Sequence, residues 1–153
     1  MKVIDFLQPK RIVAHLNART KAGALAELSG HLAEQEPGVE AESLRKVLEE
    51  RELLASTAIG DGIAIPHGKL DSVGHLVGTL GRSVEGIEFE SIDGKPTHLI
   101  FMLVAPASST GVHLKALARL SRLFRDADFR QRLLAAPDAP AMYQVIADED
   151  AKY

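Results

Sequence analysis

One histidine of the chain stands in a setting that could make its side chain reactive. His67 lies between Pro66 and Gly68, near the end of the segment GIAIPHGK. Proline restricts the backbone of the residue before it, and glycine adopts backbone angles that other residues resist. A histidine held in this way can serve as a metal ligand, a general base or a nucleophile. Because no serine motif needs a base and no second ligand lies nearby in the sequence, a nucleophile is favoured.

A phosphoryl group is a natural electrophile for such a nucleophile. Neutral imidazole is available near neutral pH because its unperturbed pKa is about 6.5, and the phosphorylated product carries about two negative charges. Two other segments could stabilise those charges. Arg51, near the C-terminal end of a predicted helix, supplies a permanently charged guanidinium. The predicted helix start at 109–113 supplies free N–H groups together with His113.

These residues also have purely structural interpretations. An arginine near a helix C-terminus stabilises the helix dipole by about 0.3–1 kcal/mol, whatever else it does. A cationic histidine is disfavoured at a helix start, so we expect His113 to be neutral. From the residues alone, a phosphoryl-accepting His67 and an α/β domain without assigned chemistry are equally good interpretations.

Other familiar catalytic patterns are missing from the sequence. Five residues separate Gly62 from Gly68 where a phosphate-binding loop has four, and Leu70 replaces its magnesium-binding Ser or Thr. The Gly60-Asp61-Gly62 segment lacks the third glycine of a dinucleotide-binding fingerprint. The chain has no cysteine, which excludes thiolate sites and disulfides.

A metal centre is not predicted either. None of the six histidines forms an HxH or HxxxH pair, and His31 with Glu34 would supply only two ligands. The remaining histidines are expected to be ordinary surface or sheet-edge residues: His15, His31, His75 and His98. We therefore expect no metal and no organic cofactor.

The elements that must position these groups follow from hydrophobic periodicity and turn signals. The expected elements are, in order, helices at about 21–35 and 40–52, short extended pieces on either side of 60–62, strands at about 75–82 and 99–105, and helices after 108–111, at about 128–135 and from Pro140. The unbroken apolar run at 99–105 is typical of a central strand covered on both faces. This order predicts an α/β (α+β) layer fold with a mixed β-sheet.

Length and composition set broad limits on the function. The 153 residues, 1–153, suit a single domain without repeats or linkers. A net charge of -3 disfavours nucleic acid as the main partner. The N-terminus does not resemble a signal peptide, and no stretch approaches the 18 apolar residues of a membrane span. We expect a cytoplasmic protein without direct membrane insertion.

Three segments together resemble a known family. The run RELLASTAIGDGIAIPHGKL is similar to the active-site segment of enzyme IIA domains of the bacterial phosphotransferase system, fructose/mannitol type. IEFESIDGKPTHLIFMLVAP looks like the central hairpin and strand of that family, and HLKALARLSRLF looks like its following helix. The resemblance covers essentially the whole chain. One departure is Ala58, where the family usually has glycine, so Ala58 must find a permissive backbone.

The resemblance implies a fold, a reaction and a site. Members of this family are cytoplasmic phosphocarriers with a mixed sheet flanked by helices on both faces. The histidine matching His67 accepts a phosphoryl group from phosphohistidine on a small histidine-phosphocarrier protein (HPr-like or NPr-like). The positions matching Arg51 and His113 line the same site and stabilise the phosphoryl group.

A separate chain of this length is similar to the nitrogen-regulatory subgroup. The resemblance implies a phosphotransferase component that acts mainly as a regulator of partner proteins, through its phosphorylation state. Two alternatives stay open at this point. The chain could be a sugar-transport component that passes the phosphoryl group to a fructose/mannitol-type permease domain, or an interaction module whose histidine is never phosphorylated.

Overall fold

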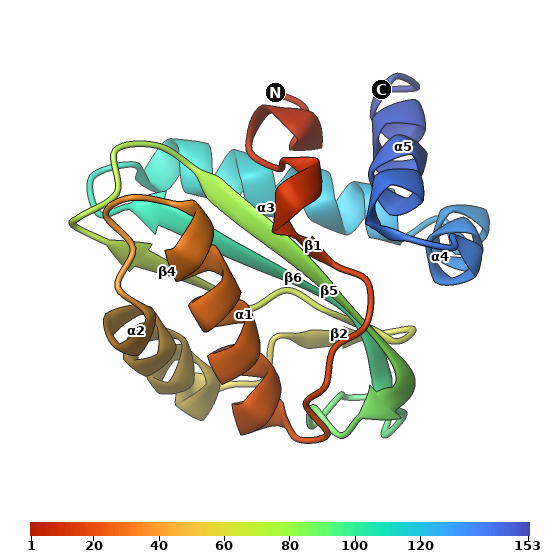
Figure 1. The fold of residues 1–153 in the computed structure, drawn as a ribbon, viewed down its shortest axis with the longest axis horizontal. Coiled ribbons are helices and arrows are strands. Elements are labelled where there is room, and N and C mark those ends of the chain that lie inside the picture. Colours follow the sequence, from red (N-terminus) through yellow and green to blue (C-terminus); the bar gives the residue numbers. More distant parts are fainter.

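A mixed sheet forms the centre of the molecule, and helices pack against both of its faces (Figure 1). The computed structural model describes residues 1–153. Its elements are the 3-10 turns η1 (Val3–Asp5) and η2 (Pro9–Arg11), strand β1 (Ile12–Val13), helices α1 (Lys21–Gln35) and α2 (Ala41–Leu54), strands β2 (Ala58–Gly60), β3 (Ile63–Ala64), β4 (His67–Leu70), β5 (Val77–Ile87) and β6 (Thr97–Pro106), and helices α3 (Thr110–Phe124), α4 (Ala127–Ala135) and α5 (Ala139–Asp150).

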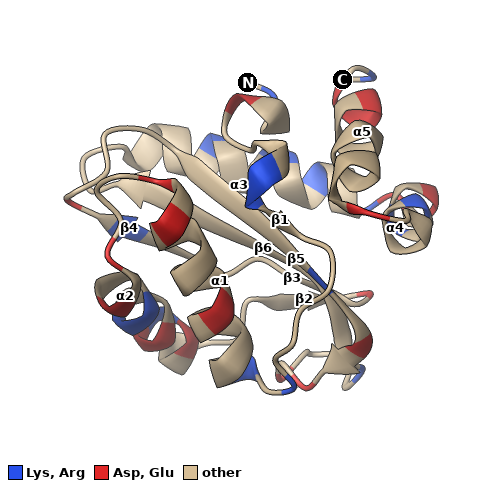
Figure 2. Cartoon of the chain, in the orientation of Figure 1, with Lys and Arg blue, Asp and Glu red and all other residues tan.

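Strand β6 is the central strand, as its apolar run predicts. It carries no Lys, Arg, Asp or Glu, and Figure 2 shows the charged residues gathered on the helices and loops around it. β5 pairs antiparallel with one side of β6, while β3 and then β4 pair parallel with the other side. β4 pairs with no other strand.

The two faces of the sheet bury separate apolar cores, which explains why β6 has no polar alternation. Leu99, Phe101 and Leu103 face the core that includes side chains of α3, α4 and α5. Ile100 and Met102 face the core that includes side chains of α1 and α2. This arrangement confirms the predicted mixed sheet with helices on both faces. None of the helices combines the length and apolar character that crossing a membrane requires.

The predicted elements agree with the structure to within a few residues, except along β5. This strand was expected to end near Arg82 but continues to Ile87, with a register shift between these two residues. The sequence hides this extension because Val84 and Glu85 are both exposed and break the alternation of apolar and polar residues. The N-terminal segment was assigned no element, yet it forms η1, η2 and β1.

Candidate functional site

Strand β4 presents alternate residues to the two sides of the sheet. The Cβ atom that any other residue would have at Gly68 would lie 2.7 Å from Val47 Cγ1, so this position faces α2. His67 and Lys69 therefore point to the opposite face, toward α3. The expectation that Gly68 supplies unusual backbone angles is wrong, because its φ is not positive. Glycine is needed here because α2 lies too close for a side chain.

The turn predicted at 60–62 is present between β2 and β3. Gly60 and Gly62 have φ angles of 93° and 80°, and Asp61 between them has a φ of 56°. This turn joins β2 to β3 as an antiparallel pair. Ala58 lies within β2 without a positive φ, so the alanine in place of the usual glycine strains nothing.

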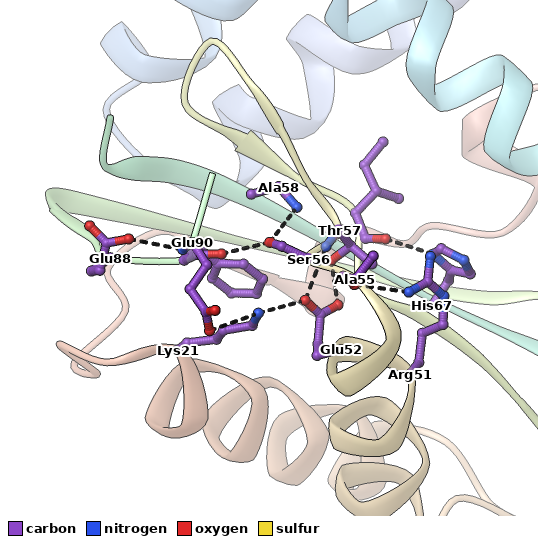
Figure 3. Close-up of polar contacts among 12 residues, drawn as sticks. Lys21, Arg51, Glu52, Ala55, Ser56, Thr57, Ala58, His67, Glu88 and Glu90 are labelled. Atoms are coloured by element: carbon purple, nitrogen blue, oxygen red, sulfur yellow. Dashed lines mark hydrogen bonds and ion pairs between the residues drawn. The ribbon is translucent and has the colours of Figure 1, made fainter. Parts of the chain in front are cut away.

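The ring of His67 is oriented by a contact with its own strand. Its Nδ1 lies 2.8 Å from the carbonyl oxygen of Ile65 (Figure 3). A carbonyl oxygen only accepts, so Nδ1 carries the proton and donates it. The lone pair of the neutral ring is thus on Nε2, which points away from this contact. Of the two ring nitrogens, Nε2 is therefore the one whose lone pair could act as a nucleophile.

Arg51 reaches the same place from the last turn of α2. Its Nη1 donates to the carbonyl oxygen of Ala55 at 3.0 Å, which ties the guanidinium to the end of the helix next to His67 (Figure 3). Burial lowers the pKa of His67 below its usual value, and the charge of Arg51 lowers it further. The Ile65 carbonyl and Glu52 oppose this shift. The ring is therefore neutral, and Nε2 is free to react, at neutral pH.

A chain of hydrogen bonds connects α2 to His67, and sequence reasoning missed it. The carboxylate of Glu52 accepts from Thr57 N at 3.0 Å and from Thr57 Oγ1 at 2.6 Å. The carbonyl of Thr57 accepts from Ile65 N at 3.0 Å, and the carbonyl of Ile65 holds His67. Lys21 Nζ balances the buried Glu52 carboxylate at 2.9 Å (Figure 3). The only sequence signal for these hydrogen bonds was the acidic residue next to Arg51.

His113 lies in the first turn of α3 and faces His67. The two ring centroids are 5.4 Å apart, with an interplanar angle of 82°. His113 is only 6% exposed, and its Nε2 has no hydrogen-bond partner. Burial lowers its pKa below the usual value, and the charges of His67 and Lys69 lower it further. The ring is neutral, as expected for a histidine at a helix start.

The start of α3 adds backbone donors to the site. The side chain of Ser109, the N-cap residue, caps none of the free N–H groups of the first turn. The first backbone bond of the helix runs from His113 N to Ser109 O at 2.9 Å, so Thr110, Gly111 and Val112 precede it with free N–H groups. The unprotonated Nε2 of His67, a guanidinium, a buried imidazole and a helix N-terminus thus converge from three segments. This set of groups suits an anion bound to His67 Nε2.

The other histidines lie outside this arrangement. His31 Nε2 contacts the carbonyl of Lys10 at 2.8 Å, and His98 Nδ1 contacts that of Ser83 at 2.9 Å. His75 lies beside Glu36, with 3.2 Å between Nε2 and Oε1. No cluster of three or more His, Asp or Glu side chains could hold a metal ion.

Comparison with known proteins gives a consistent result. Residues 5–149 match the family described as phosphoenolpyruvate-dependent sugar phosphotransferase system, EIIA 2. A nitrogen regulatory protein from Bradyrhizobium diazoefficiens is 43% identical over 147 residues, which are 96% of this chain and 95% of that protein. The fructose-specific EIIABC component of Bacillus subtilis is 34% identical over 150 residues, which are 98% of this chain but 24% of that protein.

A solved structure agrees with the sequence matches. The crystal structure of nitrogen regulatory protein IIA-Ntr from Neisseria meningitidis superposes with a TM-score of 0.87 at 30% identity, and the match covers 93% of this chain and 97% of that one. The matched sequence spans the elements that carry His67, Arg51 and His113. The chain belongs to the EIIA 2 family of the phosphoenolpyruvate-dependent sugar phosphotransferase system.

Proposed function

We propose that this chain is a regulatory phosphocarrier whose phosphoacceptor is His67 Nε2. The donor is phosphohistidine on a small HPr-like or NPr-like carrier protein. The single observation that supports this most is the Nδ1 contact with Ile65, which leaves Nε2 as the free nucleophilic atom of a neutral ring. The similarity to nitrogen regulatory proteins over nearly their full length supports the regulatory role, and the cytoplasmic location is part of the same proposal.

The transfer step needs no metal and no proton transfer between the two reacting rings. The Nε2 lone pair of His67 forms a bond to the donor's phosphorus while the donor's P–N bond breaks. The electron pair of that bond returns to the donor's ring nitrogen. The His67 proton stays on Nδ1, where the Ile65 carbonyl stabilises it as the phosphorylated ring becomes cationic. Positioning and charge stabilisation carry the catalysis.

Three groups stabilise the phosphoryl charge in this proposal. Arg51 supplies a guanidinium that matches phosphoryl oxygens with two parallel N–H donors. His113 Nε2 is buried and unpartnered, so a proton taken up there on phosphorylation gives a donor to the phosphoryl group. The free N–H groups of α3 add a positive dipole end.

Exposed apolar side chains lie on the two helix ends that form the site, and they suit a protein donor. Leu53 and Leu54 at the end of α2 are 86% and 83% exposed, and Val112 and Leu114 at the start of α3 are 44% and 61% exposed. Apolar surface of this kind is removed from water when a partner protein docks on it. A new dianion at its centre changes which partner binds, which makes phosphorylation a switch.

The test is phosphorylation by a reconstituted donor chain. The protein is mixed with phosphoenolpyruvate, the general phosphotransferase enzyme and its histidine carrier, and intact mass is measured. We expect an acid-labile gain of one phosphoryl group that is absent from His67→Ala and present in His98→Ala, a matched control outside the site. No gain in the wild-type protein would show that the chain is an unphosphorylated interaction module.

A second experiment separates regulation from sugar transport. Free and phosphorylated protein are each used as bait, and the bound proteins are identified. We expect partners that distinguish the two forms and are not sugar permeases. Rapid phosphoryl transfer from His67 to a permease domain, with sugar phosphorylation downstream, would contradict the regulatory assignment.

A further inference from the structure

Lys69 lies two residues after His67 on the same strand. Gly68 between them faces α2, so both side chains project toward α3. Successive residues of a strand are about 3.3 Å apart, which places the two Cα atoms about 7 Å from each other. A lysine side chain is long enough to bring its ammonium group to a phosphoryl group on the His67 ring.

The ammonium group of Lys69 is already directed to the phosphoryl site. Its Nζ donates to Thr110 Oγ1 at 2.9 Å, and Thr110 is the first residue of α3, three before His113. The charge of Lys69 also acts on His113, whose pKa it helps to lower. Lys69 is therefore close to the ring that faces His67, on the side where the helix N–H groups are free.

No carboxylate neutralises Lys69. Two of the other seven lysines form ion pairs: Lys21 with Glu52 at 2.9 Å and Lys152 with Glu149 at 3.1 Å. Lys69 has only a neutral hydroxyl as its side-chain partner. An ammonium group without a counterion, next to a helix N-terminus and a neutral histidine, gives this corner of the site a positive charge that attracts an anion.

We propose that Lys69 is a second cation of the phosphoryl site. When His67 is phosphorylated, the ammonium group gives up its hydrogen bond to Thr110 and donates to a phosphoryl oxygen instead. This inference rests on the proposed function. Thr110 is then a positioning residue that keeps the ammonium group near the site while His67 is free. Arg51 and Lys69 hold the phosphoryl group from α2 and from β4, and Lys69 helps to set how strongly His67 retains it.

The expected effect is on an equilibrium. A cation that touches the product but not the free ring shifts the phosphoryl-transfer equilibrium toward phosphorylated His67. We expect Lys69→Gln to lower the equilibrium constant for transfer from the carrier by about fivefold, the size of one solvent-accessible charge-assisted contact. Lys69→Arg, which keeps the charge, should restore most of it.

The experiment uses the chain of residues 1–153 and three variants of it. Wild type, Lys69→Gln, Lys69→Arg and the control Lys95→Gln are equilibrated with phosphorylated carrier, and all species are quantified. Lys95 carries the same charge but lies before the start of β6. The β6 residue that pairs with His67 is Leu103, eight residues after Lys95. A role in donor docking alone changes the rate and leaves the equilibrium constant unchanged.

Phosphorus NMR supplies a readout that does not involve the carrier. A nearby ammonium group favours the phosphoryl dianion, so Lys69→Gln should raise the pKa of the phosphoryl group by about half a unit. Thr110→Val should change both measurements much less than Lys69→Gln, because the ammonium group remains.

The possible outcomes separate the two proposals. If the wild-type protein accepts no phosphoryl group, the proposed function fails and this inference fails with it. If the wild type is phosphorylated but Lys69→Gln has the same equilibrium constant and the same phosphoryl pKa, only the inference is overturned. A Lys69→Gln protein that folds normally by circular dichroism but accepts no phosphoryl group, while Lys95→Gln does, supports it.

Discussion

The proton on His67 Nδ1 has opposing effects on reactivity. Its bond to the Ile65 carbonyl fixes the tautomer that exposes the Nε2 lone pair, but the same bond stabilises the cationic ring, which has no lone pair to give. Burial and Arg51 act the other way, and the net result is a lowered pKa of His67. The residues around the ring thus keep it both oriented and neutral, which a histidine in water achieves only in part near pH 6.5, its approximate unperturbed pKa.

Replacing Arg51 by glutamine should change both the rate and its pH dependence. The pKa of His67 rises when the cation is removed, so the protonated, unreactive fraction appears at higher pH. As pH falls, phosphoryl transfer by Arg51→Gln should fall earlier than transfer by wild type. Above the pKa of both proteins, transfer should still be about 100-fold slower because a donor to the transition state is lost.

The measurement is a pH–rate profile, combined with an NMR titration of the His67 ring. Arg122→Gln is the matched control, since this arginine lies exposed near the end of α3 and contacts Tyr153 instead. A His67 pKa that stays the same in Arg51→Gln would show that the guanidinium does not act on the ring. An unfolded Arg51→Gln protein with normal transfer per folded molecule would make Arg51 purely structural.

At the residue level, the sequence identified the side chains of the site but not the hydrogen bonds that hold them. His67, Arg51 and His113 were recognisable because each has a side chain that suits phosphoryl chemistry, and the structure brings them together. Glu52 and Thr57 were missed because their link to His67 passes through backbone groups: Thr57 N donates to Glu52, and the Thr57 carbonyl accepts from Ile65 N. Such partners are set by the path of the chain, which no local pattern records.

Among the elements, the contact between α2 and β4 does most to place the site. α2 carries Arg51, β4 carries His67, and the helix can approach the strand only because Gly68 has no side chain. Leu48, from the same helix, also lies within 4 Å of the position that a Gly68 Cβ would take, and is fully buried. A shift of α2 therefore moves Arg51 relative to the His67 ring.

Gly68→Ala should consequently affect stability and transfer together. The added Cβ would lie 2.7 Å from Val47 Cγ1, so helix or side chain must move, at a cost of about 1–3 kcal/mol in the free energy of unfolding. Urea unfolding measures the first effect, and the initial rate of phosphorylation the second.

The double variant Gly68→Ala/Val47→Ala tests this explanation. Removing the Val47 methyl groups opens the space that the new Cβ needs. The double variant should therefore lose less unfolding free energy, measured with urea, than the sum of the losses in the two single variants. Additive losses would mean that the backbone conformation at Gly68, and not the approach of α2, is what requires glycine. Gly30→Ala is the control, since nothing lies within 4 Å of its Cβ position.

Hydrophobic periodicity predicted the longer elements well but not the short elements of the N-terminal segment. α1 and α3 were recognisable from apolar residues at helical spacing, and β6 from its unbroken apolar run. β1 has two residues and η1 has three, which is too short for any period to show. Their positions depend on contacts elsewhere, such as the bond from Gly78 N to the carbonyl of Phe6 at 2.7 Å.

In the molecule as a whole, the sequence predicted that both faces of the sheet are covered, but not which residues form each of the two cores. A central apolar strand between helical segments requires cover on both faces, which gave the fold class. The sequence could not show that the N-terminal residues Val3, Phe6 and Leu7 join the core of α3 and α5. Nor could it show that both ends of the chain meet, because that contact joins residues 146 positions apart.

One buried carboxylate links the two ends of the chain. Asp150, which is 1% exposed, accepts from Ile4 N at 3.0 Å and from Arg119 at 2.9 Å and 3.2 Å. Asp150→Asn leaves the Arg119 guanidinium without its counter-charge and should lower the free energy of unfolding by about 3 kcal/mol. Asp148→Asn, on the exposed side of the same helix, should change it by less than about 0.5 kcal/mol.

This loss should leave the chemistry intact, because Arg119 lies six residues after His113 along α3 and its contacts lie at the far end of α5. Phosphorylation of Asp150→Asn, measured per folded molecule at a temperature where the protein remains folded, should match wild type. A normal unfolding curve would show that the buried carboxylate contributes little to stability. A normal curve together with slow phosphorylation would instead mean that the C-terminal helix acts on the His67 site through α3, which the separation of the two sites argues against.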